Sequence, residues 1–129
     1  MKTYSKELIV AQDDLDELEH VNNVRYVQWI QDISKEHWLR CAPPALRENT
    51  HWVVMTHHIQ YKAAAVLGDP LRLVTHIEKS RGAISVRVVH IHHAKTNTLF
   101  VRSSTEWVLL NADTQKPIRI PKEVQEIFS

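Results

Sequence analysis

The stretch that decides the fold reads DLDELEHVNNVRYVQWI over residues 14–30. Its first half is acidic, and its second half carries apolar side chains at the three- and four-residue spacing of a helix that buries one face. Asn22 and Asn23 stand at the junction, where an asparagine side chain can accept a hydrogen bond from a free backbone amide. The pattern predicts a helix over residues 23–39, about 25 Å long at ~1.5 Å per residue.

The segments on either side of this helix predict strands. Residues 3–11 are short and partly β-branched, which favours a first strand. Pro43 and Pro44 end the helix, and the polar residues 47–50 predict a connecting loop. Pro121 opens a short terminal helix. Four further strands are expected between the loop and that helix, over residues 51–61, 71–78, 83–93 and 99–110.

Alternation along these strands assigns their side chains to faces. Over residues 51–61 one face is expected to carry Val53, Met55, Ile59 and Tyr61, and the other Trp52, Val54 and Gln60. One face of the next strand carries Leu71, Leu73, Thr75 and Ile77. An early helix followed by an antiparallel meander is an α+β arrangement, in which a curled sheet of about five strands wraps the central helix. Its unpaired edges favour assembly with a second copy.

Composition and charge narrow the class of protein. The chain has 129 residues with 43% hydrophobic and 24% charged side chains, which predicts a single domain over residues 1–129. A formal net charge of +1 provides no basic field, so nucleic acid is not expected as a partner. No segment has the length and hydrophobicity of a membrane span. Cys41 is the only cysteine, which rules out an internal disulfide and agrees with a cytoplasmic location.

The stretch over residues 14–30 resembles the hotdog-fold thioesterases, both the 4-hydroxybenzoyl-CoA thioesterase type and the acyl-ACP thioesterases. In that family a D-x-D stretch leads through H-V-N-N into the central helix, which continues with Tyr and Trp. Residues 59–62 and 66–69 resemble the strand and turn that follow, although a proline common between them is absent. The resemblance implies a hotdog fold and a cofactor-free, metal-free hydrolase of acyl-CoA or acyl-ACP. It also implies a homodimer or homotetramer with active sites at the interface.

The resemblance assigns roles residue by residue. The catalytic acid of the family falls on Asp16, and the histidine of acyl-ACP thioesterases falls on His20. Leu18 departs from the pattern, because those enzymes have an asparagine there. Asn23 completes the candidate catalytic set. The candidate substrate-binding residues are Asn22, Val24, Tyr61, Gly68, Asp69 and Arg81, and Lys79, Arg87 and Arg102 are further candidates for holding the phosphates of coenzyme A.

The chemistry explains why this pattern points to thioester hydrolysis. Attack on the carbonyl carbon places negative charge on the carbonyl oxygen, which free amides and the dipole at a helix start can stabilise. The backbone at residues 22–24 is the expected place for those amides. Asp16 is expected either to activate water as a general base or to attack directly and form an acyl-enzyme anhydride. The sequence leaves both routes open.

Two other functions remain open from the sequence. Because Leu18 replaces the asparagine of the family, the chain could bind or sense acyl thioesters without hydrolysing them. A hotdog hydratase or dehydratase needs an acid and a base placed across a β-carbon, and no distinct pattern for that is present. His90 and His92 are expected on one strand face, but adjacent His57 and His58 point opposite ways, so a metal site is not expected.

Overall fold

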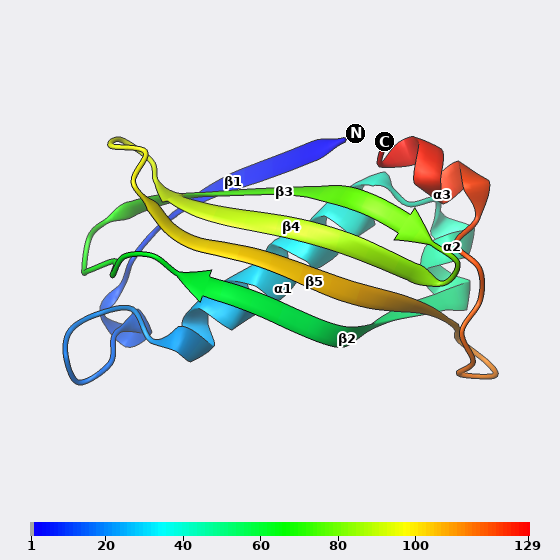
Figure 1. Ribbon diagram of the computed structural model, residues 1–129, viewed down its shortest axis with the longest axis horizontal. Coiled ribbons are helices and arrows are strands. Elements are labelled where there is room, and N and C mark those ends of the chain that lie inside the picture. Colours follow the sequence, from blue (N-terminus) through cyan, green and yellow to red (C-terminus); the bar gives the residue numbers. More distant parts are fainter. Residues whose placement is uncertain (1) are drawn as a thin grey trace.

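The computed structural model describes residues 2–129, and in it one long helix lies against one curled sheet (Figure 1). The elements follow in the order β1 (Thr3–Ile9), η1 (Gln12–Asp14), α1 (Asn23–Cys41), α2 (Pro44–Asn49), β2 (Thr50–Tyr61), β3 (Pro70–Arg81), β4 (Ile84–His93), β5 (Leu99–Asn111) and α3 (Lys122–Ile127). The sheet is antiparallel, with strand order β1-β3-β4-β5-β2. The α+β arrangement with five strands is confirmed, and β1 and β2 are its edges.

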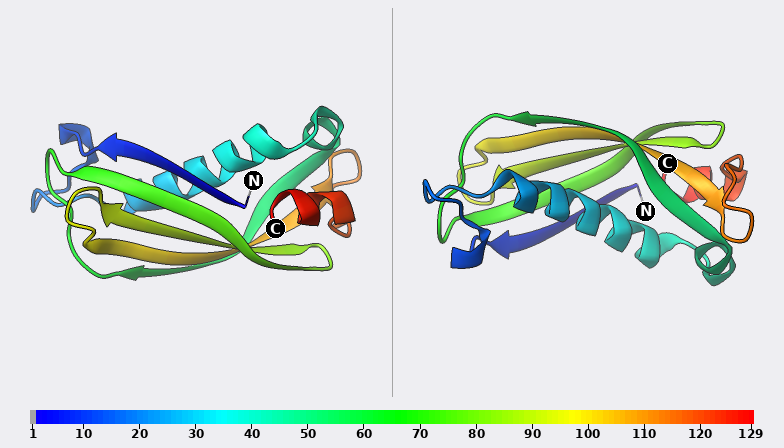
Figure 2. Two further views of the ribbon diagram at one scale, coloured as in Figure 1. Left: turned by 90° about the horizontal axis from the view of Figure 1, so that it is seen from above. Right: turned by 90° about the horizontal axis from the view of Figure 1, so that it is seen from below.

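Helix α1 fills the concave side of the sheet, as the two side views show (Figure 2). Asn22 caps it, because its side chain accepts from the amide of Val24. The predicted end at residue 39 lies two residues short of the observed end at Cys41. The buried side chains recur at helical spacing and include Tyr26, Trp29, Ile30, Ile33, Ser34 and His37.

The loop predicted over residues 47–50 is wrong. Residues Pro44–Asn49 form α2, and Thr50 is already the first residue of β2. Pro44 occupies the first turn of α2, where a proline is tolerated because its missing amide hydrogen has no helical partner there. The hydroxyl of Thr50 donates to the carbonyl of Leu46 and so joins the end of α2 to β2.

The faces predicted for the strand over residues 51–61 are also wrong in part. The pairing of β2 with β5 shifts register between Val54 and Thr56, which marks a bulge. The bulge reverses the alternation of side chains along β2. Trp52 and Ile59 were predicted on opposite faces, but both point toward the helix. Trp52 contacts Trp38 of α1, and Ile59 packs on the core around α1. Val53 and Met55 are instead exposed.

The core lies between α1 and the inner face of β3, β4 and β5. The predicted inner residues Leu71, Leu73 and Thr75 of β3 are fully buried, and Ile77 is partly buried. A second apolar cluster at the far end joins α3 to β5, through Leu109 and Phe128 among others. Within residues 2–129 no helix is long and apolar enough to cross a membrane.

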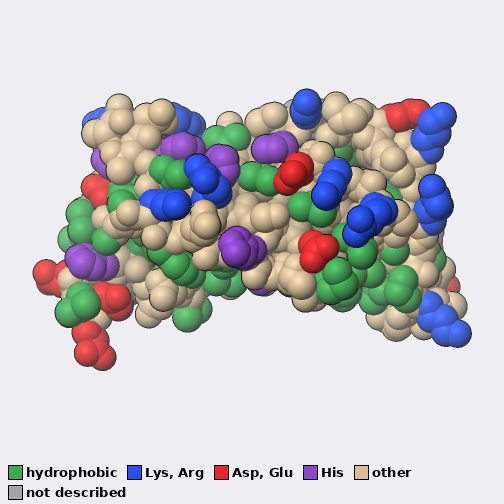
Figure 3. All heavy atoms as spheres, viewed as in Figure 1, with side chains coloured by type: hydrophobic (Ala, Val, Ile, Leu, Met, Phe, Trp, Pro, Cys, Tyr) green, Lys and Arg blue, Asp and Glu red, His purple; other side chains and the backbone are tan. Residues whose placement is uncertain are grey.

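The outer face of the sheet is rich in histidine (Figure 3). The rings of His90 and His92 lie 5.9 Å apart, which confirms that they share a face. His58 is exposed, whereas Nδ1 of His57 lies 2.9 Å from the hydroxyl of Thr105 on the inner side. In the described chain no group of three or more His, Cys, Asp or Glu side chains is arranged to hold a metal ion.

Candidate active site at the start of α1

Asp16 lies in the loop that leads from η1 into α1, and it builds a tight turn there. Its Oδ1 accepts from the amides of Leu18, at 2.9 Å, and His20, at 3.2 Å. Its backbone amide donates to the carbonyl of His20 at 2.8 Å, and Glu19 adopts a positive φ of 60°. These bonds fix one carboxylate oxygen of an exposed side chain. The second oxygen, Oδ2, has no hydrogen-bond partner among residues 2–129.

The turn at residues 66–69 holds this loop against the sheet. His20 forms a β-bridge with Val66, which brings two regions that are far apart in the sequence side by side. The carboxylate of Asp69 accepts from the amide of Val66 at 3.0 Å. Gly68 adopts φ of 83°, a conformation that favours glycine, and its amide donates to the carbonyl of Val10. Four predicted residues, Asp16, His20, Gly68 and Asp69, therefore gather at one end of the sheet.

The backbone amides at the start of α1 are mostly occupied. The amide of Asn22 donates to the carbonyl of Asp14 at 2.9 Å, and the amide of Val24 donates to Oδ1 of Asn22 at 3.0 Å. Free amides were expected around residues 22–24, and two of the three are therefore occupied within the chain. Only the amide of Asn23 has no partner within the described chain. The capping that starts the helix is what takes up the amide of Val24.

Tyr26 connects α1 to the segment that follows β2. It is one of the side chains with helical spacing in the stretch over residues 14–30, and the sequence indicated no other role for it. Its hydroxyl accepts from the amide of Ala65 at 3.3 Å, and its ring lies 5.8 Å from that of Tyr61. Burial raises the pKa of Tyr26, and the negative charge of Asp69 raises it further. Tyr61, a predicted substrate contact, is about half exposed beside it. The recurrence of Tyr in the family signature was the signal that could have identified this role.

Arg81 lies far from this end of the sheet. Strand β3 runs for 12 residues from Pro70 to Arg81, which is about 36 Å at ~3.3 Å per residue. The turn after Arg81 contacts the C-terminal segment, where the amide of Ile120 donates to the carbonyl of Gly82. Within one chain the structure therefore does not bring Arg81 to Asp16.

Large apolar side chains are exposed around the start of α1. Leu18 and Val24 have exposed fractions of 75% and 76%. Ile9, Val66 and Leu67 are exposed at the same end, on β1 and on the turn that His20 pairs with. These five residues form an apolar rim beside Asp16 and Asn23.

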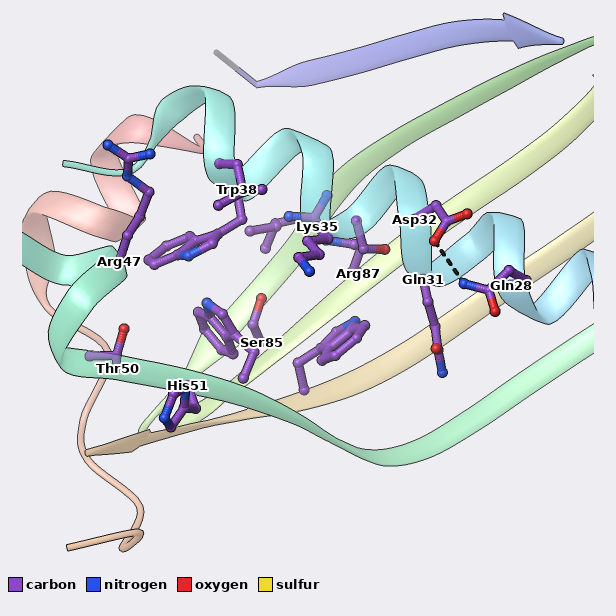
Figure 4. Close-up of a pocket in the computed structure, with 15 residues that line it drawn as sticks. Gln28, Gln31, Asp32, Lys35, Trp38, Arg47, Thr50, His51, Ser85 and Arg87 are labelled. Carbon is purple, nitrogen blue, oxygen red and sulfur yellow. Dashed lines mark hydrogen bonds between the residues drawn. The ribbon is translucent and has the colours of Figure 1, made fainter. Parts of the chain in front are cut away.

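A pocket of about 520 Å³ opens between the second half of α1 and the strands, and Asp16 is not among its lining residues. Figure 4 shows Trp38 and Lys35 of α1 over Ser85 and Arg87 of β4, with Arg47 at the α2 end. Arg87 is only 5% exposed, so it is not the surface cation expected to meet coenzyme A phosphates. Burial lowers its pKa to about 10.

Comparison with known proteins identifies the family of the chain. Residues 1–128 match the acyl-ACP thioesterase N-terminal domain family. The chain is 28% identical over 106 residues to the chloroplastic acyl-[acyl-carrier-protein] hydrolase FATB1 of Cuphea viscosissima, which covers 82% of this chain and 23% of that protein. It is 25% identical over 95 residues to the chloroplastic dodecanoyl-[acyl-carrier-protein] hydrolase of Cinnamomum camphora, covering 74% of this chain and 22% of that protein. The chain thus spans about a quarter of the length of these relatives.

Solved structures share the fold at lower identity. A 4-hydroxybenzoyl CoA thioesterase mutant complexed with 4-hydroxybenzoyl CoA superposes with a TM-score of 0.87 at 17% identity, covering 100% of both chains. A 1,4-dihydroxy-2-naphthoyl-CoA thioesterase from Synechocystis gives 0.85 at 18% identity, covering 98% and 95%. The fold is therefore the hotdog fold, and by its sequence match the chain belongs to the acyl-ACP thioesterase N-terminal domain family.

Proposed function

We propose that this protein hydrolyses acyl thioesters carried by coenzyme A or acyl carrier protein. One observation carries the proposal: Asp16 stands at the start of α1 with Oδ2 unbonded and the amide of Asn23 nearby in the chain and also unbonded. Family membership supports the same chemistry. A carboxylate and a free helix-start amide supply the two functions that thioester hydrolysis needs.

The bonds of Asp16 suit it to a catalytic task. Two backbone amides hold Oδ1, so the carboxylate cannot rotate freely, and Oδ2 is left to act. As a general base it takes a proton from water, whose oxygen attacks the carbonyl carbon. As a nucleophile it forms an anhydride, which water then cleaves. In both routes the carbonyl oxygen becomes an oxyanion, the carbon–sulfur bond breaks, and the thiolate leaves. The thiolate takes up the proton that the attacking water loses, by way of Asp16 in the first route and during cleavage of the anhydride in the second.

The amide of Asn23 is the proposed donor to the oxyanion. It belongs to the first residue of a 19-residue helix, where the helix dipole favours negative charge. The amide of Val24 becomes a second donor to the oxyanion only when the side chain of Asn22, to which it now donates, turns away. His20, Tyr61, Gly68 and Asp69 are proposed to shape the substrate entrance, because they lie at the same end, and Arg81 is left outside the site of its own chain.

We propose a homodimer or homotetramer that closes this site. The exposed rim at the start of α1 is apolar, and burying such a surface is the usual driving force for association. Strand β2 is a 12-residue edge strand with one side unpaired within the described chain. A partner would cover Asp16 and exclude water, which strengthens the interaction of the amide with the oxyanion. We also propose a cytoplasmic location, which the single cysteine of the chain, Cys41, supports because it can form no disulfide within the chain.

Thiol release from a panel of aliphatic and aromatic acyl-CoAs and acyl carrier protein thioesters tests the proposal. We expect Asp16→Asn to lower kcat/KM by about 100- to 10,000-fold on the accepted substrates, the usual range for a lost general base. Asp13→Asn is the matched control, because it removes an exposed carboxylate from η1, three residues before Asp16. Equal loss in both variants, or no loss in Asp16→Asn, would contradict the assignment.

A second candidate is an acyl-thioester-binding domain without turnover. The exposure of Asp16 favours it, because within one chain the carboxylate lines neither of the two pockets described. Calorimetry that finds stoichiometric binding of acyl-CoA, together with unchanged thioester after prolonged incubation, would establish this function in place of hydrolysis.

A further inference from the structure

The buried charge of Arg87 has no carboxylate partner. Its Nη1 donates to Thr75 at 3.0 Å and lies 2.9 Å from Nδ1 of His37, and both groups are neutral when the histidine accepts. No Asp or Glu forms an ion pair with it within residues 2–129. A buried cation of this kind is costly unless something pairs with it.

Arg87 has unused hydrogen-bond donors and lines an open space. Both polar contacts come from Nη1, so the N–H groups of Nη2 and Nε have no acceptor in the described chain. Arg87 lines the pocket of about 520 Å³ between α1 and the sheet. A planar guanidinium with a free edge matches the two oxygens of a carboxylate.

Aromatic side chains give the pocket an apolar wall. Three of the four tryptophans of the chain line it, namely Trp38, Trp52 and Trp107. The indole Nε1 of Trp107 is buried and has no partner within residues 2–129, so it is a further donor for an anionic or polar ligand. Lys35 and Arg47 also line the pocket, against a single carboxylate, Asp32, whose Oδ1 accepts from Gln28.

We propose that this pocket binds the carboxylate of an apolar acid, with the free edge of the Arg87 guanidinium on the carboxylate and the indoles around the apolar body (Figure 4). Lys35 and Arg47 lie nearer the surface and attract the anion. The Arg87 end of the pocket is remote from the proposed catalytic group, because Arg87 contacts α1 at His37, 14 residues from Asn23 and about 21 Å away at ~1.5 Å per residue. The other end of the pocket begins at Gln28, five residues from Asn23.

Two sources supply this chemistry. One is a free carboxylic acid, the class of product that thioester hydrolysis releases. The other is the distal carboxyl group of an acyl chain that is still attached to its thiol. The second source rests on the proposed function, whereas binding of a free acid does not depend on hydrolysis.

Intrinsic tryptophan fluorescence and calorimetry with dodecanoate test the site in the full chain. We expect saturable binding of dodecanoate, little binding of uncharged dodecanamide, and a Kd about 10- to 100-fold higher in Arg87→Met, the usual effect of losing a hydrogen bond to a charged group. Arg119→Met removes an exposed arginine that does not line the pocket and is expected to leave the Kd unchanged. Lys35→Met, at an exposed position, is a second variant whose folding is not at risk.

Kinetics distinguish the two sources. If the distal carboxyl group is the ligand, wild type prefers the mono-CoA thioester of dodecanedioic acid over dodecanoyl-CoA, and Arg87→Met loses at least tenfold of that preference in kcat/KM. If free acid is the ligand, dodecanoate binds while the preference is absent. The proposed site is wrong if dodecanoate does not bind and the preference is also absent. It is also wrong if dodecanamide binds as tightly as dodecanoate. Failure of all thioesters to turn over contradicts the proposed function alone, because direct binding is measured separately.

Discussion

The Nη1 atom of Arg87 on β4 lies 2.9 Å from Nδ1 of His37 on α1, so a buried cation joins the sheet to the central helix. This contact does not neutralise the charge. Burial holds the pKa of Arg87 at about 10, well below its ordinary value, so the folded state disfavours the charged form. Arg87 is charged at neutral pH in both states, and the folded state alone carries the burial penalty.

We therefore expect Arg87→Met to stabilise the protein. The depressed pKa corresponds to a penalty on the order of 3 kcal/mol. The lost hydrogen bonds to His37 and Thr75 offset about 1 kcal/mol of it in all, and the lost contact of the guanidinium with the Phe128 ring offsets about 0.5–1 kcal/mol more. The free energy of unfolding should rise by about 1 kcal/mol, as measured by urea denaturation at neutral pH. A loss of stability would show that Arg87 acts as a structural link between β4 and α1.

Protonation of His57 should make stability fall at mildly acidic pH. Burial lowers the pKa of His57, whose Nε2 is buried and has no partner within residues 2–129. The pKa of His90 is lowered too, first by burial and then by His92 and Arg102. Because the folded pKa lies below the unfolded value of 6.5, the unfolded state binds more protons. Stability is therefore complete above about pH 6.5 and is lost as the pH falls below that value.

Urea denaturation at about pH 7.5 and about pH 5 checks this sign. His57→Gln should lose less stability between the two pH values than wild type, because it has one fewer group to protonate on unfolding. His58→Gln is the control, since His58 is exposed on the outer face. A steeper fall in His57→Gln, or equal effects of both variants, would refute the role of burial at His57.

Two substitutions of Asn22 distinguish its effect on helix stability from its effect on the oxyanion. Asn22→Ala removes the cap from the amide of Val24 and should lower the free energy of unfolding by about 1 kcal/mol. Asn22→Asp keeps a capping oxygen and adds a charge that the helix dipole favours, so stability is retained. That same charge stands beside the proposed oxyanion and should lower kcat about tenfold. Unchanged kcat in Asn22→Asp would place the oxyanion away from Asn23.

The central helix was predictable because its signals are local. Asn22 caps the helix by accepting from the amide of Val24, two positions later in the sequence. The apolar spacing of residues 26–33 follows from the geometry of the helix itself. The bulge between Val54 and Thr56 was not predictable, because it depends on the register with β5, which is remote in sequence. Strict alternation therefore placed Val53 and Ile59 on one face, although the bulge separates them.

The candidate site was also predictable from the sequence only in part. The D-x-D and H-V-N-N motif gave Asp16 and the helix start, but the bridge from His20 to Val66 spans 46 positions and leaves no local pattern. Arg87 did carry a local signal. It alternates with Val89 and Ile91, both fully buried, so its position two residues before Val89 already placed it on the inner face.

Tyr26 should prove to be a buried anchor of the strand exit. Its hydroxyl is the acceptor for the amide of Ala65, which is fully buried and cannot turn to water. Tyr26→Phe leaves that amide without a partner and should cost about 1–3 kcal/mol in the free energy of unfolding. Tyr61→Phe is the matched control, because Tyr61 is 46% exposed and its hydroxyl has no partner within the described chain. Equal losses in both variants would mean that ring packing, and not the bond to Ala65, holds residues 61–65 against α1.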